Sequence, residues 1–169
     1  MAIYYADGSN SSSGRQIQVI TATSGTYTQI TSDTYTNFAN HYIDITPKSN
    51  GNRLIGTFGA YLNNRDNDPD SRVKFMVQEQ VSGLTNTNVY FPNLNEGKDN
   101  HQWISKASNN GSTDTDMWNL ITLHWIRTLP SSGRAGVSHR FQLMGGNQGS
   151  NADSIKSLGF SGTIMEVTV

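Results

Sequence analysis

Short alternating runs are the sequence feature that most constrains this fold. Residues with high strand propensity recur in runs of about eight, and Gly, Asn, Ser, Asp or Pro clusters bound each run. No long segment keeps a helical period of 3.6 residues. Expected strands or strand-containing segments are 16–23, 26–38, 41–46, 53–63, 71–80, 116–129, 137–144 and 162–169. The pattern predicts an all-β, antiparallel jelly-roll sandwich with an extended N-terminal segment.

Two of these runs give clear faces. In segment 41–46, Ile43 and Ile45 are expected inward, with Tyr42 and Asp44 outward. Segment 53–63 places Leu54, Gly56, Phe58, Ala60 and Leu62 on one face.

The most apolar segment, 116–129, is apolar on both faces when read as a strand; a helix is the main competing interpretation. A strand of this kind must be covered on both faces. A second chain or the chain's own loops could supply the cover. We assign a subunit interface to one face, formed by Met117, Ile121, Leu123 and Trp125.

The ends of the chain suggest two parts. Residues 1–14 form an expected docking tag and linker, and residues 15–169 the jelly-roll domain. Ile3, Tyr4 and Tyr5 precede a stretch of linker composition, GSNSSSG, and are predicted to dock on another protein. An edge strand added to the chain's own sheet is the alternative.

Composition excludes several classes. With no Cys, disulfides, thiol catalysis and cysteine-bound metals are ruled out. A net charge of -1 and the absence of a long apolar run give no reason to expect nucleic acid or membrane insertion. The first residues lack the features of a signal peptide.

No motif indicates a catalytic, cofactor or metal site. The alternating Asp66, Asp68 and Asp70 lack the Gly and Glu of a calcium loop, so a solvated turn is the preferred interpretation and a cation the alternative. Carboxylates could also converge for sugar cleavage; the candidates are Glu79, Asp99, Asp114 and Asp116.

Aromatic residues near Asn-rich loops suggest a second function. Tyr90 and Trp103 could stack on sugar rings, as in a carbohydrate-binding, lectin-like module, although the preferred interpretation is that Trp103 fills the edge of the core.

Several motifs resemble small virion appendage proteins of marine and cyanobacterial tailed bacteriophages. They are MAIYYADGS, QIQVITAT, the block TYTNFANHYIDITPKSNGNRLIGTF and the ending SGTIMEVTV. The resemblance implies a non-enzymatic tail-fibre, tail-tip or head-decoration protein with a jelly roll like that of tumour necrosis factor. It also implies a homotrimer that is assembled in the host cytoplasm, docks on other virion proteins through its N-terminus and contacts a host-surface glycan.

Overall fold

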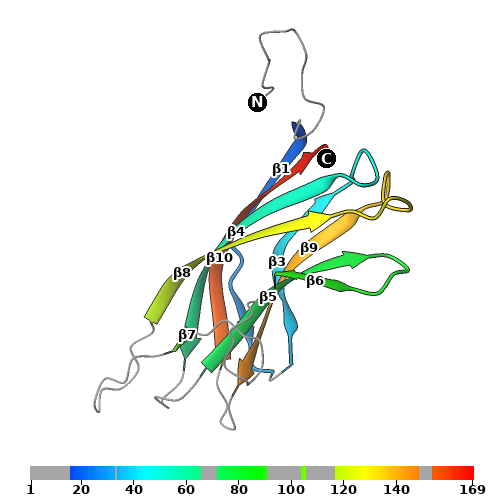
Figure 1. The fold of residues 1–169 in the computed structure, drawn as a ribbon. Helices are drawn as coiled ribbons and strands as arrows, with labels where there is room; N and C mark the ends of the chain where they lie inside the picture. Colours follow the sequence, from blue (N-terminus) through cyan, green and yellow to red (C-terminus); the bar gives the residue numbers. More distant parts are fainter. Residues whose placement is uncertain (1–15, 33, 66–71, 91–103, 106–116, 149–153) are drawn as a thin grey trace, which may run out of the picture.

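The computed structural model describes residues 16–32, 34–65, 72–90, 104–105, 117–148 and 154–169 (Figure 1). Ten strands make up this part of the chain. They are β1 (Gln16–Ser24), β2 (Thr28–Ile30), β3 (Thr36–Ile45), β4 (Arg53–Arg65), β5 (Arg72–Val81), β6 (Thr87–Tyr90), β7 (Ile104–Ser105), β8 (Met117–Thr128), β9 (His139–Gln148) and β10 (Ser154–Val167). The proposed tag, residues 1–14, lies outside the described residues.

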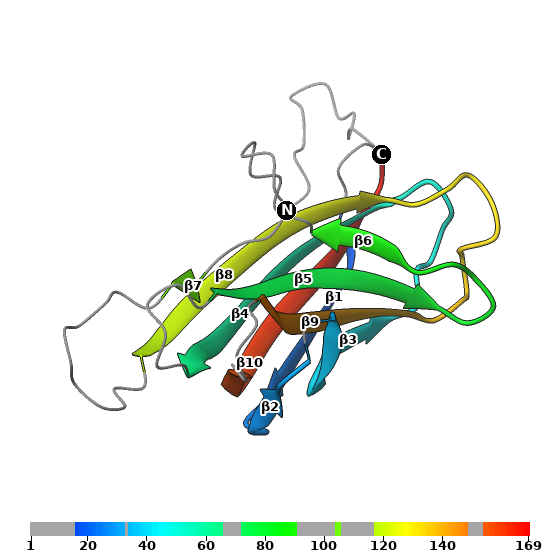
Figure 2. The same cartoon turned by 90° about the horizontal axis from the view of Figure 1, so that it is seen from below.

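The strands form two sheets that pack face to face (Figure 2). The first has the order β1-β10-β4-β8, with β2 also paired to β10; the second has the order β3-β9-β5-β6, with β7 paired to β5. Every pairing is antiparallel. Apart from the β5–β6 hairpin, successive long strands lie in opposite sheets, which is the strand order of a jelly roll. The predicted fold class is therefore confirmed.

Alternation along the strands builds the core between the sheets. Leu54, Phe58 and Leu62 of β4 point inward and are fully buried, as their spacing predicts. From the opposite sheet, Ile43 and Ile45 of β3 reach the same core, with Phe75, Val77, Phe141 and Leu143. The expected faces of 41–46 and 53–63 are thus confirmed.

One end of the sandwich is held together by a buried carboxylate. Glu166 of β10 is fully buried and accepts hydrogen bonds from the backbone N–H of Lys48 at 2.9 Å and from Nδ2 of Asn52 at 2.6 Å. Both donors belong to the turn that joins β3 to β4. In the same region, Asn50 Oδ1 accepts from the backbone N–H groups of Arg134 and Ala135, each at 2.8 Å. The two loops at this end are therefore fixed to β10 and to each other.

Towards the other end, β3 contains a long bulge. Asn37 pairs with Met144 and Tyr42 with Gln142, so residues 38–41 are inserted into the ladder. Gln142 fills the interruption, because its Nε2 donates to the carbonyls of Phe38 at 2.8 Å and His41 at 3.1 Å. The bulge turns the His41 ring into the core.

No helix of the described part has the length and hydrophobicity needed to cross a lipid bilayer.

Candidate interaction surface

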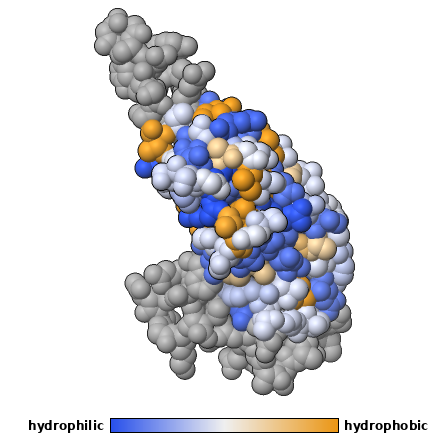
Figure 3. All heavy atoms as spheres, turned by 90° about the vertical axis from the view of Figure 1, so that its right-hand side faces the viewer, coloured by the Kyte–Doolittle hydropathy of each residue, from blue (hydrophilic) through white to orange (hydrophobic). Residues whose placement is uncertain are grey.

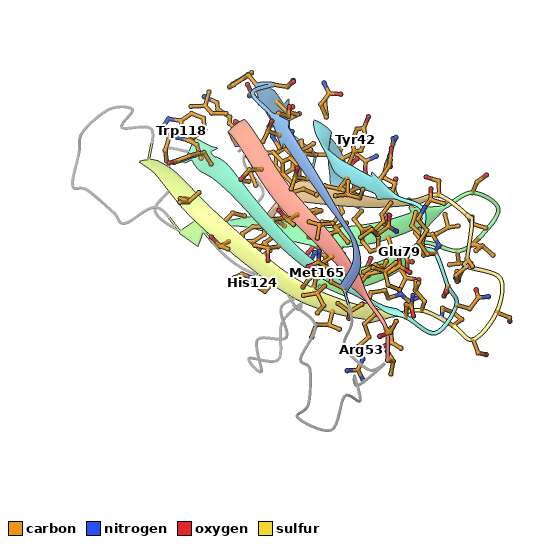
Figure 4. All side chains as sticks on the ribbon, turned by 90° about the horizontal axis from the view of Figure 1, so that it is seen from above. Tyr42, Arg53, Glu79, Trp118, His124 and Met165 are labelled. Carbon is orange, nitrogen blue, oxygen red and sulfur yellow. The ribbon has the colours of Figure 1, made fainter. Side chains whose placement is uncertain are left out.

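The outer face of the β1-β10-β4-β8 sheet is the strongest candidate for a functional surface. Its side chains follow from the register. One row across the four strands is apolar: Val19, Met165, Ile55 and Ile126. Val19 is 43% exposed and Ile126 64% exposed, so the row is open to solvent. Figure 4 labels Met165 on this sheet.

The next two rows carry small hydroxyl side chains. Thr21, Thr163 and Thr57 lie side by side on β1, β10 and β4, followed by His124 on β8. The further row contains Thr23, Ser161, Gly59 and Thr122. All of these residues except His124 line an open depression of about 450 Å³. His124 Nδ1 lies 3.0 Å from Thr57 Oγ1, which fixes the ring over the sheet.

A second apolar group borders the depression. Tyr61 pairs with Leu120, and their side chains are 51% and 62% exposed. From the Val19 row to the Tyr61 row, none of the outward side chains on β1, β10, β4 and β8 is Asp, Glu, Lys or Arg. An uncharged face with two exposed apolar groups is typical of a surface that binds another macromolecule.

The subunit interface predicted on β8 was assigned to the wrong face of the strand. Ile121, Leu123 and Trp125 point between the sheets and belong to the chain's own core, with Leu123 only 1% exposed. Trp125 stacks on Phe141, with ring centroids 4.4 Å apart. The Met117 side chain is not among those described. The opposite face of β8, with Leu120 and Ile126, is the exposed one.

The other predicted sites lie beyond what the structure describes. The docking residues Ile3, Tyr4 and Tyr5, the loop from Asp66 to Asp70, and Trp103 are outside the described residues. Tyr90 is the last residue of β6, but its side chain is not described. Among the described residues, no group of His, Asp or Glu is arranged to hold a metal ion.

Glu79 proves to be part of a buried ionic cluster. It is 2% exposed, and its carboxylate accepts hydrogen bonds from His139 Nδ1 at 2.6 Å and Arg127 Nε at 2.7 Å. Burial alone would raise the pKa of Glu79, but the hydrogen bond from His139 and the charge of Arg127 outweigh it and lower the pKa. Glu79 therefore links β5 to β9 and to β8 of the other sheet.

This cluster was not predicted from the sequence. The inward alternation of Phe75, Val77 and Glu79 was the available signal, because a charge at an inward position requires a buried partner. Asp99, Asp114 and Asp116, the suggested companions of Glu79 for sugar cleavage, are outside the described residues.

Comparisons with known proteins bear on the fold. A scan against protein-family models finds no match. A search of curated proteins also finds no match. Among solved structures, the chain is similar to the VP2 subviral particle of infectious bursal disease virus, with 16% identity and a TM-score of 0.42 over 92% of this chain. It spans 33% of that chain, about one third of its length.

A second similar structure is the CBM22-1 xylan-binding domain of Xyn10C from Paenibacillus barcinonensis. The identity is 8% and the TM-score 0.31, over 93% of this chain and 97% of that one. The jelly-roll assignment itself rests on the strand order given above.

Proposed function

We propose that this protein is a structural component of a tailed-phage virion, a fibre, tail appendage or head decoration that works by binding its neighbours. The observation that carries the proposal is the uncharged outer face of the β1-β10-β4-β8 sheet, with its exposed row of Val19, Met165, Ile55 and Ile126. The sequence resemblance to virion appendage proteins supports the same role.

The neighbour we assign to this face is another copy of the chain, in a homotrimer. Around a three-fold axis, the uncharged face of each copy contacts its two neighbours without like-charge repulsion, and the apolar rows gain free energy when water is removed from them. A face four strands wide and seven residues long, from the Val19 row to the Tyr61 row, covers roughly 450 Å². Stable interfaces bury about 800 Å² per partner, so this face would supply about half of the required area.

Within the proposal, residues 1–14 attach each copy to the particle, with Ile3, Tyr4 and Tyr5 as the contact. The globular part is then displayed without making or breaking covalent bonds. The protein would be found in the virion, after assembly in the host cytoplasm.

Self-association is tested by Ile126→Glu, which places a charge in the apolar row. Light scattering after size-exclusion chromatography should give a trimer for the wild type and a smaller species for the variant, with an unchanged circular dichroism spectrum. Leu84→Glu is the matched control, because Leu84 is 46% exposed in the β5–β6 turn, away from the sheet. A monomeric wild type at micromolar concentration would refute the proposed assembly.

Attachment is tested separately by deleting residues 1–8. The shortened chain should fold and form trimers but should be absent from purified particles probed with an antibody to the jelly roll. Normal incorporation of the shortened chain would refute the docking role of Ile3, Tyr4 and Tyr5.

A further inference from the structure

The outer face of the other sheet, β3-β9-β5-β6, carries a connected cluster of side-chain amides. Gln78 is at its centre: its Nε2 donates to Asn88 Oδ1 at 3.1 Å, and its Oε1 accepts from Asn86 Nδ2 at 3.1 Å and Gln80 Nε2 at 3.3 Å. Gln80 Nε2 also lies 3.4 Å from Asn37 Oδ1. These amides come from β3, β5, β6 and the turn between β5 and β6, so the cluster crosses the sheet.

Beside the amides lies Tyr42, whose ring contacts an arginine that forms an ion pair. Tyr42, Gln142, Gln78 and Asn88 form one row across the four strands. The guanidinium carbon of Arg140 lies 3.7 Å from the centroid of the Tyr42 ring.

Asp44 fixes that guanidinium. Its carboxylate accepts from Arg140 Nε at 2.9 Å and from Nη2 at 3.0 Å. The pair is neutral as a whole and remains accessible, since each side chain is 42% exposed. The tyrosine and the guanidinium are therefore held in place before any ligand arrives.

The chemistry of this face differs from that of the opposite sheet. Figure 3 views the molecule from the right-hand side of Figure 1, where β5 ends and β6 begins, and blue or pale residues separate the orange ones into small groups. Figure 4 places Tyr42 along β3, away from His124 and Met165 on the other sheet. This face therefore offers few apolar side chains for contact with another protein.

Side-chain amides suit a ligand that is rich in hydroxyl groups. Each amide has two N–H donors and an oxygen with two lone pairs, and a sugar hydroxyl is likewise donor and acceptor. Planar amide and guanidinium groups that are already fixed lose little entropy on binding. Because Arg140 is neutralised by Asp44, the part of the face around Tyr42 and Gln78 favours an uncharged ligand over an anionic one.

We propose that this face, the amide platform of Asn37, Tyr42, Gln78, Gln80, Asn86, Asn88 and Arg140, binds an uncharged glycan chain. The platform lies on the sheet opposite the proposed assembly face, so it would point away from neighbouring copies. This inference deepens the proposed display function by naming the ligand class, but glycan binding by a single copy does not require assembly.

The test is an array of uncharged and acidic oligosaccharides, probed with the purified full-length chain through an antibody to an added terminal tag. The wild type should bind a set of uncharged glycans. Gln78→Ala should weaken that binding about ten-fold, since it removes the amide that orders the others. Asn88→Ala is a second variant at an exposed position, and Ser131→Ala, at an exposed position in the loop between β8 and β9, is the matched control.

The outcomes separate this inference from the proposed function. Binding that Gln78→Ala or Asn88→Ala weakens and Ser131→Ala leaves unchanged supports the platform, whatever the oligomeric mass of the same sample. The inference is overturned by an array without bound glycans, by binding confined to acidic glycans, or by equal binding of wild type and both platform variants at equal melting temperature. In each of these cases, the trimer and its place in the particle are judged by their own experiments.

Discussion

The indole of Trp125 occupies the space directly above Gly56, its cross-strand neighbour on β4. A Cβ atom at position 56 would overlap the six-membered ring of the indole. The missing side chain therefore allows Trp125 to lie flat in the core, stacked on Phe141 and with its edge toward Phe58.

Gly56→Ala should destabilise the protein by about 1–3 kcal/mol or more, because the added methyl forces the indole out of its position. The free energy of unfolding from urea denaturation measures the effect. Gly59→Ala on the same strand is the control: its Cβ would lie 3.3 Å from Ser161 Oγ, near the solvent-facing depression, so a smaller change is expected. Equal losses for both variants would contradict the packing described for Trp125.

Leu123→Ala distinguishes a core residue from an interface residue. Leu123 is 1% exposed within a single chain, and truncation of such a leucine typically costs about 2–5 kcal/mol. We expect a lower melting temperature with the same oligomeric mass as the wild type. Dissociation of the assembly at unchanged melting temperature would instead place an interface on this face of β8.

Acid should weaken the fold through Glu79. Its pKa in the folded protein is below the ordinary value of 4.5, so the unfolded chain takes up the proton first. The stabilisation is complete above pH 4.5 and is lost as the pH falls through the folded pKa.

Glu79→Gln should therefore flatten the dependence of unfolding free energy on pH below 4.5. It should also cost about 3 kcal/mol at neutral pH, because Arg127 and His139 lose their carboxylate. Urea denaturation at a series of pH values measures both effects. A variant with the wild-type slope below pH 4.5 would show that other groups dominate acid unfolding.

His41 should affect the stability of the fold in a higher pH range than Glu79 does. Burial lowers its pKa below 6.5, and the hydrogen bond to the Ala39 carbonyl opposes this only in part. The neutral ring donates from Nδ1 to Ala39 O and accepts at Nε2 from Ser157 Oγ, each at 2.6 Å. Since the unfolded chain is protonated first as the pH falls below 6.5, stability should decrease there.

His41→Gln removes this titration, so the variant should lose less stability than the wild type between pH 7 and pH 5, although it starts from a lower value. Thermal unfolding at fixed ionic strength gives both slopes. If the two slopes agree, His41 takes up its proton over the same pH range in both states, and folding does not lower its pKa.

The strands and their inward faces could largely be predicted from sequence, because alternation is a local property. Segments 53–63 and 71–80 differ from β4 and β5 by at most two residues at either end. The covered face of β8 could not be predicted. Both faces of that strand are apolar, and the choice depends on Gly56, which is distant in sequence but adjacent in the sheet.

The candidate surfaces depend still more on register. The row of Val19, Met165, Ile55 and Ile126 combines four strands, and no single strand shows it. The amide platform likewise gathers side chains from β3, β5 and the β5–β6 hairpin. No turn motif in the sequence predicts the bulge at residues 38–41, which buries His41.

The central position of β10 has a consequence for biosynthesis. β10 lies between β1 and β4, and its Glu166 fixes the turn after β3. Until residues 154–167 have left the ribosome, β1 has no partner strand and the first sheet has a gap in its middle. A chain that stops before residue 154 would lack the strand that joins β1 to β4, and we expect proteases to degrade it more readily.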